Sequence, residues 1–245
     1  MKIRIELFKM IKSSVYLFLL FVIFACEPAI DLSVIYYKQG NELYDKGKYE
    51  EAITKYSEAI EANPDQQNYY FNRGSAYFAI GNFENAIIDY SKVINLFPMN
   101  AVAYKSRGTS YFNIDDMEKA NDDFTYALKI NPIDTEALNN RAYVNVSLKD
   151  FASALEDYTE AIKIDSTNSM VFFNRGAVYD SLKQFNAAIE NYSFALQIAP
   201  DNPQNYIARG ITFLRLNKRA KACQDFNHAF QIDSTAIVYW ENFCK

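Results

Sequence analysis

The chain has 245 residues, enough for one large domain or for several stacked repeats. Its formal net charge of −5 argues against a general nucleic-acid binder, so no nucleic-acid partner is expected. With one histidine and three cysteines it cannot assemble the common zinc sites of four cysteines, or of two cysteines and two histidines. We therefore expect no metal and no cofactor.

The first 26 residues differ in composition from the rest of the chain. Basic residues between Lys2 and Lys12 precede an unbroken apolar run from Val15 to Phe24. As a helix this run spans about 15 Å, half of a bilayer core, at about 1.5 Å per residue. It therefore suits the apolar region of a signal peptide better than a transmembrane helix.

The end of this run, Ile23-Phe24-Ala25-Cys26, resembles a bacterial lipobox, in which a signal peptidase cuts before a cysteine that is then acylated. The resemblance implies a lipoprotein signal peptide over residues 1–25, palmitate on Cys26 and a short tether over residues 26–32. It also implies an exported protein that the lipid holds on a membrane of the cell envelope, since each buried methylene contributes about 0.8 kcal/mol. An ordinary cysteine at the end of an uncleaved anchor is the alternative.

The remainder of the chain follows a fixed period. Pro64, Pro98 and Pro132 are 34 residues apart, and Pro200 is two further steps along. A period of this length indicates a repeat array rather than one globular core. Each unit has apolar residues at helical spacing twice, and a proline near its end disfavours helix in the preceding residue. The array divides without insertion into units 33–66, 67–100, 101–134, 135–168, 169–202 and 203–236.

Three positions within these units carry a specific resemblance. Position 8 is small in every unit: Gly40, Gly74, Gly108, Ala142, Gly176 and Gly210. Position 20 is always alanine: Ala52, Ala86, Ala120, Ala154, Ala188 and Ala222. Position 24 is always aromatic: Tyr56, Tyr90, Phe124, Tyr158, Tyr192 and Phe226. The units therefore resemble tetratricopeptide repeats. The resemblance implies an all-α, right-handed solenoid of six helix–turn–helix repeats, and residues 237–245 read as a capping helix.

Arginine precedes the small position in five units. Position 23, on the partner helix of the same unit, is acidic in four of these and asparagine in the fifth. The unit that lacks the arginine, with Gln39, also lacks the acidic residue, with Lys55. We interpret the pairs as structural ion pairs, with a ladder for an anionic ligand as the alternative. The pairs are Arg73–Asp89, Arg107–Asp123, Arg141–Asp157 and Arg209–Asp225, and the fifth arginine, Arg175, faces Asn191.

Two cysteines lie near the end of the chain. Cys223 falls on the second helix of the last unit and Cys244 on the predicted cap, 21 residues later. Exported proteins commonly meet an oxidising compartment. The sequence therefore predicts a disulfide between them, with two buried thiols as the alternative.

The family resemblance places the first helix of each unit on a concave face. Its groove positions are aromatic or polar with few charges, which suits an extended or helical peptide. Some of these rings could instead pack only against neighbouring helices. The candidate groove residues are Tyr37, Asn41, Tyr44, Phe71, Phe78, Lys105, Phe112, Asn139, Tyr143 and Phe173.

No nucleophile–base pair and no phosphate-binding glycine loop is visible, so we expect no enzymatic activity. The predicted function is a membrane-tethered scaffold or adaptor in the bacterial cell envelope that binds a protein or peptide partner in the groove. The alternative is a module whose aromatic groove binds a glycan or another small ligand. The partner and the oligomeric state stay open, because a fold does not specify a partner.

Overall fold

The computed structural model describes residues 31–245, so the predicted signal peptide and Cys26 lie outside the described residues. The described residues form thirteen α-helices, one short 3₁₀-helix and no strand, which confirms the predicted all-α architecture. The first helices of the six repeats are α2 (Leu32–Asp45), α4 (Gln67–Ala79), α6 (Ala101–Asn113), α8 (Thr135–Ser147), α10 (Ser169–Ser181) and α12 (Pro203–Arg215). The second helices are α3 (Tyr49–Ala62), α5 (Phe83–Leu96), α7 (Met117–Ile130), α9 (Phe151–Ile164), α11 (Phe185–Ile198) and α13 (Arg219–Ile232). The chain ends with the 3₁₀-helix η1 (Ser234–Ala236) and the helix α14 (Ile237–Cys244).

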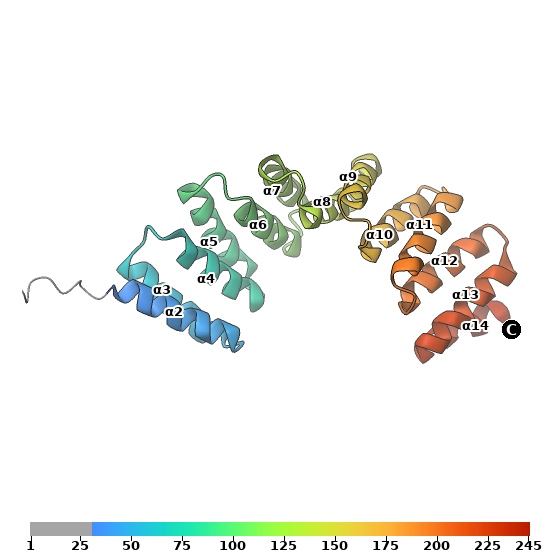
Figure 1. The fold of residues 1–245 in the computed structure, drawn as a ribbon, viewed down its shortest axis with the longest axis horizontal. Helices are drawn as coiled ribbons and strands as arrows, with labels where there is room; N and C mark the ends of the chain where they lie inside the picture. The colour runs from blue at the N-terminus through green and yellow to red at the C-terminus, as the bar shows by residue number, and fades with distance from the viewer. Residues whose placement is uncertain (1–30) are drawn as a thin grey trace, which may run out of the picture.

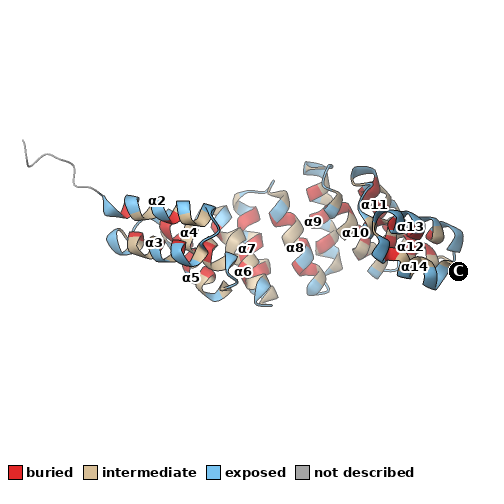
Figure 2. Ribbon diagram, turned by 90° about the horizontal axis from the view of Figure 1, so that it is seen from below, coloured by how far each residue is buried: buried red, intermediate tan, exposed pale blue. Residues whose placement is uncertain are grey.

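The helix pairs form a solenoid. Each second helix packs on its own first helix and on the first helix of the next repeat. Figure 1 shows the pairs following one another along an arch, with α4, α6 and α8 on its inner side and α5, α7 and α9 on its outer side. Buried residues recur on every repeat rather than gathering in one region (Figure 2). Stability therefore comes from each pair and from its contact with the next pair.

The small residue at position 8 lets the two helices of a repeat approach closely. A Cβ atom added to Gly108 would lie 3.1 Å from the ring of Phe124, and one added to Gly210 would lie 2.6 Å from the ring of Phe226. Both rings are almost fully buried. The ring at position 24 therefore leaves room only for a small residue at position 8, which explains why position 8 is small in every repeat.

The turn between the two helices of each repeat needs a left-handed backbone at position 15. Gly47 and Gly81 meet this requirement with φ of 72° and 77°. The other four repeats use non-glycine residues with φ between 58° and 64°, a conformation that costs L-residues about 1–2 kcal/mol. Those residues are Asp115, Lys149, Lys183 and Asn217.

The arginine at position 7 joins three helices. Arg107 donates from Nε and Nη2 to the two carboxylate oxygens of Asp123, both at 2.8 Å, and from Nη1 to the hydroxyl of Ser91 at 2.9 Å. Asp123 lies on the second helix of the same repeat and Ser91 on the second helix of the preceding repeat. The same geometry recurs for Arg73 with Asp89 and Ser57, for Arg141 with Asp157 and Thr125, and for Arg209 with Asp225 and Ser193.

The hydroxyl group that accepts from the arginine was not predicted from the sequence. Its signal is nevertheless present, because position 25 is a serine or threonine in every repeat except the last, which has no following arginine to bind. In most repeats aromatic rings also flank the guanidinium, as Tyr104 and Tyr111 do at 5.7 and 5.9 Å from Arg107. The arginine therefore fixes both the pairing within a repeat and the stacking between repeats.

Two repeats near the middle depart from this arrangement. In the fourth repeat Leu138 and Asn145 occupy the positions where other repeats place rings. In the fifth, Arg175 donates from Nε to the amide oxygen of Asn191 at 2.8 Å, while the amide group of Asn191 donates to the carbonyl of Ala187. Burial lowers the pKa of the Arg175 guanidinium, because no carboxylate replaces its lost hydration.

The C-terminal cap is covalently attached. Cys223 on α13 and Cys244 on α14 form a disulfide with an S–S distance of 2.03 Å. Arg219 donates to the carbonyl oxygens of Phe243 and Lys245 at 2.7 and 3.1 Å, which satisfies the end of α14. The cap covers the face of α13 that a further repeat would otherwise cover.

The arginine contacts predict a large loss of stability for Arg107→Ala. Asp123 is only 4% exposed, so it would become a buried charge without a partner, and breaking such a pair costs about 3–5 kcal/mol. Burial raises the pKa of the Asp123 carboxyl and Arg107 opposes that shift, so the variant carboxyl should have a still higher pKa. The loss of unfolding free energy in Arg107→Ala should be largest at neutral pH and should shrink as the pH falls through that raised pKa. Urea unfolding at several pH values measures this; a penalty independent of pH, or no penalty, would contradict it.

The fifth repeat predicts the opposite result for Asn191→Asp. The new carboxylate would meet the guanidinium of Arg175 as the aspartates do in the other repeats, and a hydrogen bond to a charged group contributes about 1.5–3 kcal/mol before desolvation. We expect a net gain of about 1 kcal/mol. Thermal unfolding of the wild type, Asn191→Asp and Asn191→Ala tests this, and an aspartate variant no more stable than the wild type would refute it.

The disulfide predicts a local effect at the C-terminus. Replacing Cys223 and Cys244 by serine releases a loop of 21 residues, which by chain entropy costs about 3 kcal/mol. Because α14 has only eight residues and is too short to be stable alone, the loss should appear as faster amide exchange in α13 and α14. Exchange in α2 to α9 should be unchanged and serves as the internal control.

Candidate functional site

The inner face of the arch carries the candidate site. Positions 5, 9 and 12 of each first helix lie on one side of that helix, since residues three and four apart share a face. The small residue at position 8 and the arginine at position 7 face the second helices. The inner positions therefore lie outside the contacts that positions 7 and 8 make with the second helices.

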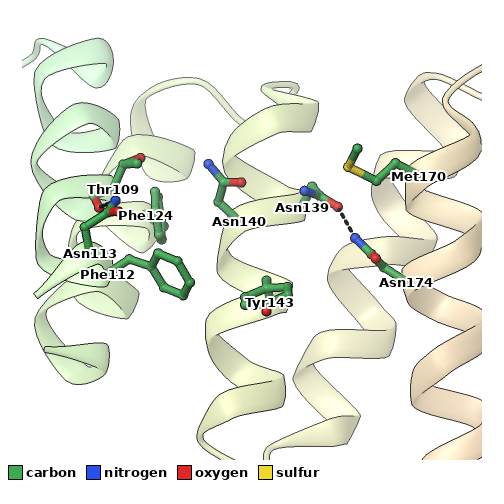
Figure 3. A pocket seen from close by; sticks show the side chains of 9 residues that line it. All are labelled: Thr109, Phe112, Asn113, Phe124, Asn139, Asn140, Tyr143, Met170 and Asn174. Carbon is green, nitrogen blue, oxygen red and sulfur yellow. Dashed lines mark hydrogen bonds between the residues drawn. The ribbon is translucent and has the colours of Figure 1, made fainter. Parts of the chain in front are cut away.

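A cavity of about 370 Å³ lies at the centre of this face (Figure 3). Its lining comes from α6, α8 and α10, with one ring from α7 beneath. None of the lining residues is charged. They are Thr109, Phe112, Asn113, Phe124, Asn139, Asn140, Tyr143, Met170 and Asn174.

Aromatic rings line one side of the cavity. Phe112 and Tyr143 meet edge to face with their ring centroids 5.5 Å apart. Phe124 is 1% exposed, whereas Tyr143 is 50% exposed and offers its ring to a ligand. An exposed aromatic ring held by a neighbouring ring is the kind of anchor that contributes most to binding energy.

Amide groups line the other side. Asn174 donates from Nδ2 to the Oδ1 atom of Asn139 at 3.2 Å, as Figure 3 shows, and Asn140 lies beside them. Within residues 31–245 no other hydrogen bond uses these three side-chain amides. The cavity thus offers neutral donors and neutral acceptors side by side.

A second, more polar cavity of about 370 Å³ lies between α2 and α4, at the N-terminal end of the inner face. Asn41 accepts hydrogen bonds at 2.8 Å from both Asn72 and Tyr56, and Asn72 also donates to the hydroxyl of Tyr37 at 3.1 Å. Burial raises the pKa of Tyr56 to about 12, so its hydroxyl stays protonated and keeps donating. Tyr44, Asp45 and Ser75 complete the lining.

The one lysine predicted in the groove is held by two carboxylates. The Nζ atom of Lys105 lies 3.0 Å from Asp134 and 2.6 Å from Glu136. Burial alone would lower the pKa of Lys105, but its hydrogen bonds to Glu136 and Asp134 raise it above the ordinary value. Lys105 is therefore committed to a local ion cluster.

Some of the predicted groove residues line a cavity, whereas the other predicted rings pack against rings of neighbouring helices. Phe112, Asn139 and Tyr143 meet in the central cavity, and Asn41 and Tyr44 in the polar one. The remaining rings lie against rings of their own second helix or, for Tyr37, also of the next first helix. These contacts are Tyr37–Tyr69, Phe71–Tyr90, Phe78–Phe83 and Phe173–Tyr192, with centroids between 4.8 and 5.5 Å apart.

Six lining residues of the central cavity are absent from the candidate groove residues: Thr109, Asn113, Phe124, Asn140, Met170 and Asn174. Three of them are asparagines, and a signal for two was available, because position 6 is asparagine in the second, fourth and fifth repeats. Among the described residues no group of three histidine, cysteine or acidic side chains is arranged to hold a metal ion. No helix among them has the length and apolar character needed to cross a membrane.

The repeat geometry agrees with comparisons to known families. Models described as TPR repeat or tetratricopeptide repeat match residues 40–81, 67–100, 106–169 and 169–202. The chain therefore belongs to the tetratricopeptide-repeat family. No curated protein matches it significantly.

Solved structures show the same fold at low sequence identity. YrrB, described as a TPR protein with an unusual peptide-binding site, has a TM-score of 0.65 at 20% identity over 76% of this chain and 96% of its own. PilF of Pseudomonas aeruginosa has a TM-score of 0.70 at 15% identity over 86% of this chain and 96% of its own. MamA of Desulfovibrio magneticus RS-1 has a TM-score of 0.66 at 18% identity over 69% of this chain and 96% of its own.

Proposed function

We propose that this protein is an interaction module that binds an extended, uncharged peptide segment of another protein in the central cavity of its inner face. The observation that carries the proposal is the composition of the lining, which combines exposed aromatic surface with amide groups and contains no charge. In the part of the chain that the structure describes, the only hydrogen bond of Asn139, Asn140 and Asn174 through their side chains is the one that joins Asn174 to Asn139. Peptide groups are themselves neutral and carry a donor and an acceptor at every residue. Asn139, Asn140 and Asn174 can pair with them in both senses.

The same lining disfavours charged ligands. A carboxylate or ammonium group entering the cavity would lose hydration without meeting an opposite charge, which is costly. Lys105 cannot compensate a ligand carboxylate, because Asp134 and Glu136 already hold it. YrrB, described as having an unusual peptide-binding site, illustrates the fold in this role.

A glycan is the competing ligand, since a half-exposed ring beside amide groups also suits a sugar. The groups that line the cavity do not require a glycan. A ring and three amides match the repeating donor and acceptor pattern of an extended chain, and the inner face continues past the cavity at both ends. A glycan array probed with the purified protein separates the two ligand classes.

The peptide proposal predicts a specific loss for Tyr143→Ala. Truncating an aromatic anchor in a binding site costs about 2 kcal/mol or more, which corresponds to at least about thirtyfold weaker binding. Tyr126→Ala is the matched control, because Tyr126 is also 50% exposed but lies on the second helix α7. Crosslinking pull-downs of envelope proteins, with wild type and both variants, give the comparison. Partners retained equally by all three proteins would defeat the proposal.

We also propose that a lipid on Cys26 tethers the module to a membrane of the cell envelope. The support is the lipobox-like sequence after the apolar run, as the residues concerned lie outside the described part of the chain. Radiolabelled palmitate should label the wild type and leave Cys26→Ser unlabelled, and the variant should leave the membrane fraction. Absence of label from the wild type would refute the tether without touching the peptide site.

A further inference from the structure

Four exposed apolar side chains follow the edge of the inner face where the central first helices begin. Met99, Val102, Ile133 and Met170 are 76%, 52%, 69% and 61% exposed. We name these four residues the apolar rim. Exposed apolar residues scattered singly need no explanation, but a run of them beside a concave site marks a contact surface.

The apolar rim departs from the pattern of the other repeats. Met99 and Ile133 occupy position 33, in the loops that precede α6 and α8. The other four repeats have polar residues there, namely Asp65, Thr167, Asp201 and Thr235. The repeat architecture therefore does not require apolar residues at this position.

The rim lies over the same three helices that line the central cavity. Val102 stands in the first turn of α6 and Met170 in the first turn of α10, and α8 contacts both helices. Met170 belongs to the rim and also lines the cavity, where Figure 3 places it beside the Asn139–Asn174 pair. The cavity and the rim are continuous at this residue.

The one lysine beside the rim is already paired. Lys105 is held by Asp134 and Glu136 next to Ile133, and the cluster keeps one excess negative charge that disfavours an acidic ligand there. Two of the four rim side chains are methionines, whose flexible thioethers adapt to varied apolar partners. The surface suits an apolar segment rather than a charged one.

We propose that the apolar rim is the second half of the peptide site, so that the bound segment leaves the cavity past Met170 and crosses the rim with uncharged, apolar side chains. The inference rests on the proposed function. First helices spaced by about 8–10 Å place α10 and α6 about 20 Å apart, which about six extended residues span. The recognised segment therefore extends about six residues beyond the cavity.

The test uses random peptides of about 16 residues, long enough to span cavity and rim, displayed on phage and selected on the purified full chain. Selected peptides are then synthesised whole and as halves, and their affinities are measured by fluorescence anisotropy. The rim variant is Met99→Asp with Ile133→Asp, which introduces the residue of the first and fifth repeats. A neutral version, Met99→Thr with Ile133→Thr, introduces the residue of the fourth and sixth.

Two controls accompany these variants. Ile88→Asp with Tyr126→Asp adds the same charge at exposed positions on second helices, 63% and 50% exposed. Phe112→Ala with Tyr143→Ala removes the anchors of the cavity. Circular dichroism establishes that each variant is folded.

Both rim variants should bind whole peptides at least about tenfold more weakly, while binding the cavity half as the wild type does. The charge control should match the wild type. Whole peptides that bind both rim variants with wild-type affinity, yet need Phe112 and Tyr143, would overturn the rim and leave the peptide site standing. Selection of no peptide, or binding independent of Phe112 and Tyr143, would overturn both.

Discussion

The bidentate pairing of arginine with a buried aspartate is the interaction on which the rest of the array depends. In four repeats the guanidinium binds the carboxylate of its own repeat and the hydroxyl of the preceding one, so one side chain sets the register of three helices. A buried aspartate is tolerated only because this partner is present. The pair therefore adds specificity of stacking to the non-directional burial of alanines and rings, which alone would permit helices to slide.

Most of the contacts that stack the repeats lie between first and second helices, so the inner face is available for binding. The small residue at position 8 and, from the second repeat on, the arginine at position 7 face the second helices, whereas the residues on the opposite side differ from repeat to repeat. The inner positions accordingly vary from repeat to repeat, giving a polar cavity at one end and a neutral, partly aromatic cavity at the centre. The fourth repeat, with Asn145 in place of a flanking ring, and the fifth, with Asn191 in place of the aspartate, supply α8 and α10 to the central cavity.

The central cavity is neutral although the chain is acidic overall. Lys105 is held by Asp134 and Glu136 beside the rim, and the central lining is made of amides, a hydroxyl, rings and a thioether. Under the proposed function, such a surface discriminates by excluding charged segments as much as by attracting apolar ones. Under the same proposal, the affinity depends on a few anchors such as Tyr143 rather than on steering by long-range fields.

The sequence by itself determined the architecture, because a 34-residue period of small, alanine and aromatic positions leaves one way to pack each helix on the next. It also determined the arginine–aspartate pairs, since Gln39 and Lys55 depart together in the first repeat. Only the tertiary structure decided which inner residues form a site. Phe112 and Asn174 are 62 positions apart and meet because successive repeats stack, whereas Phe71 and Phe173 pack on their own second helices. The period specifies neighbours within the lattice, but a cavity depends on how side chains of three repeats fill the space between them.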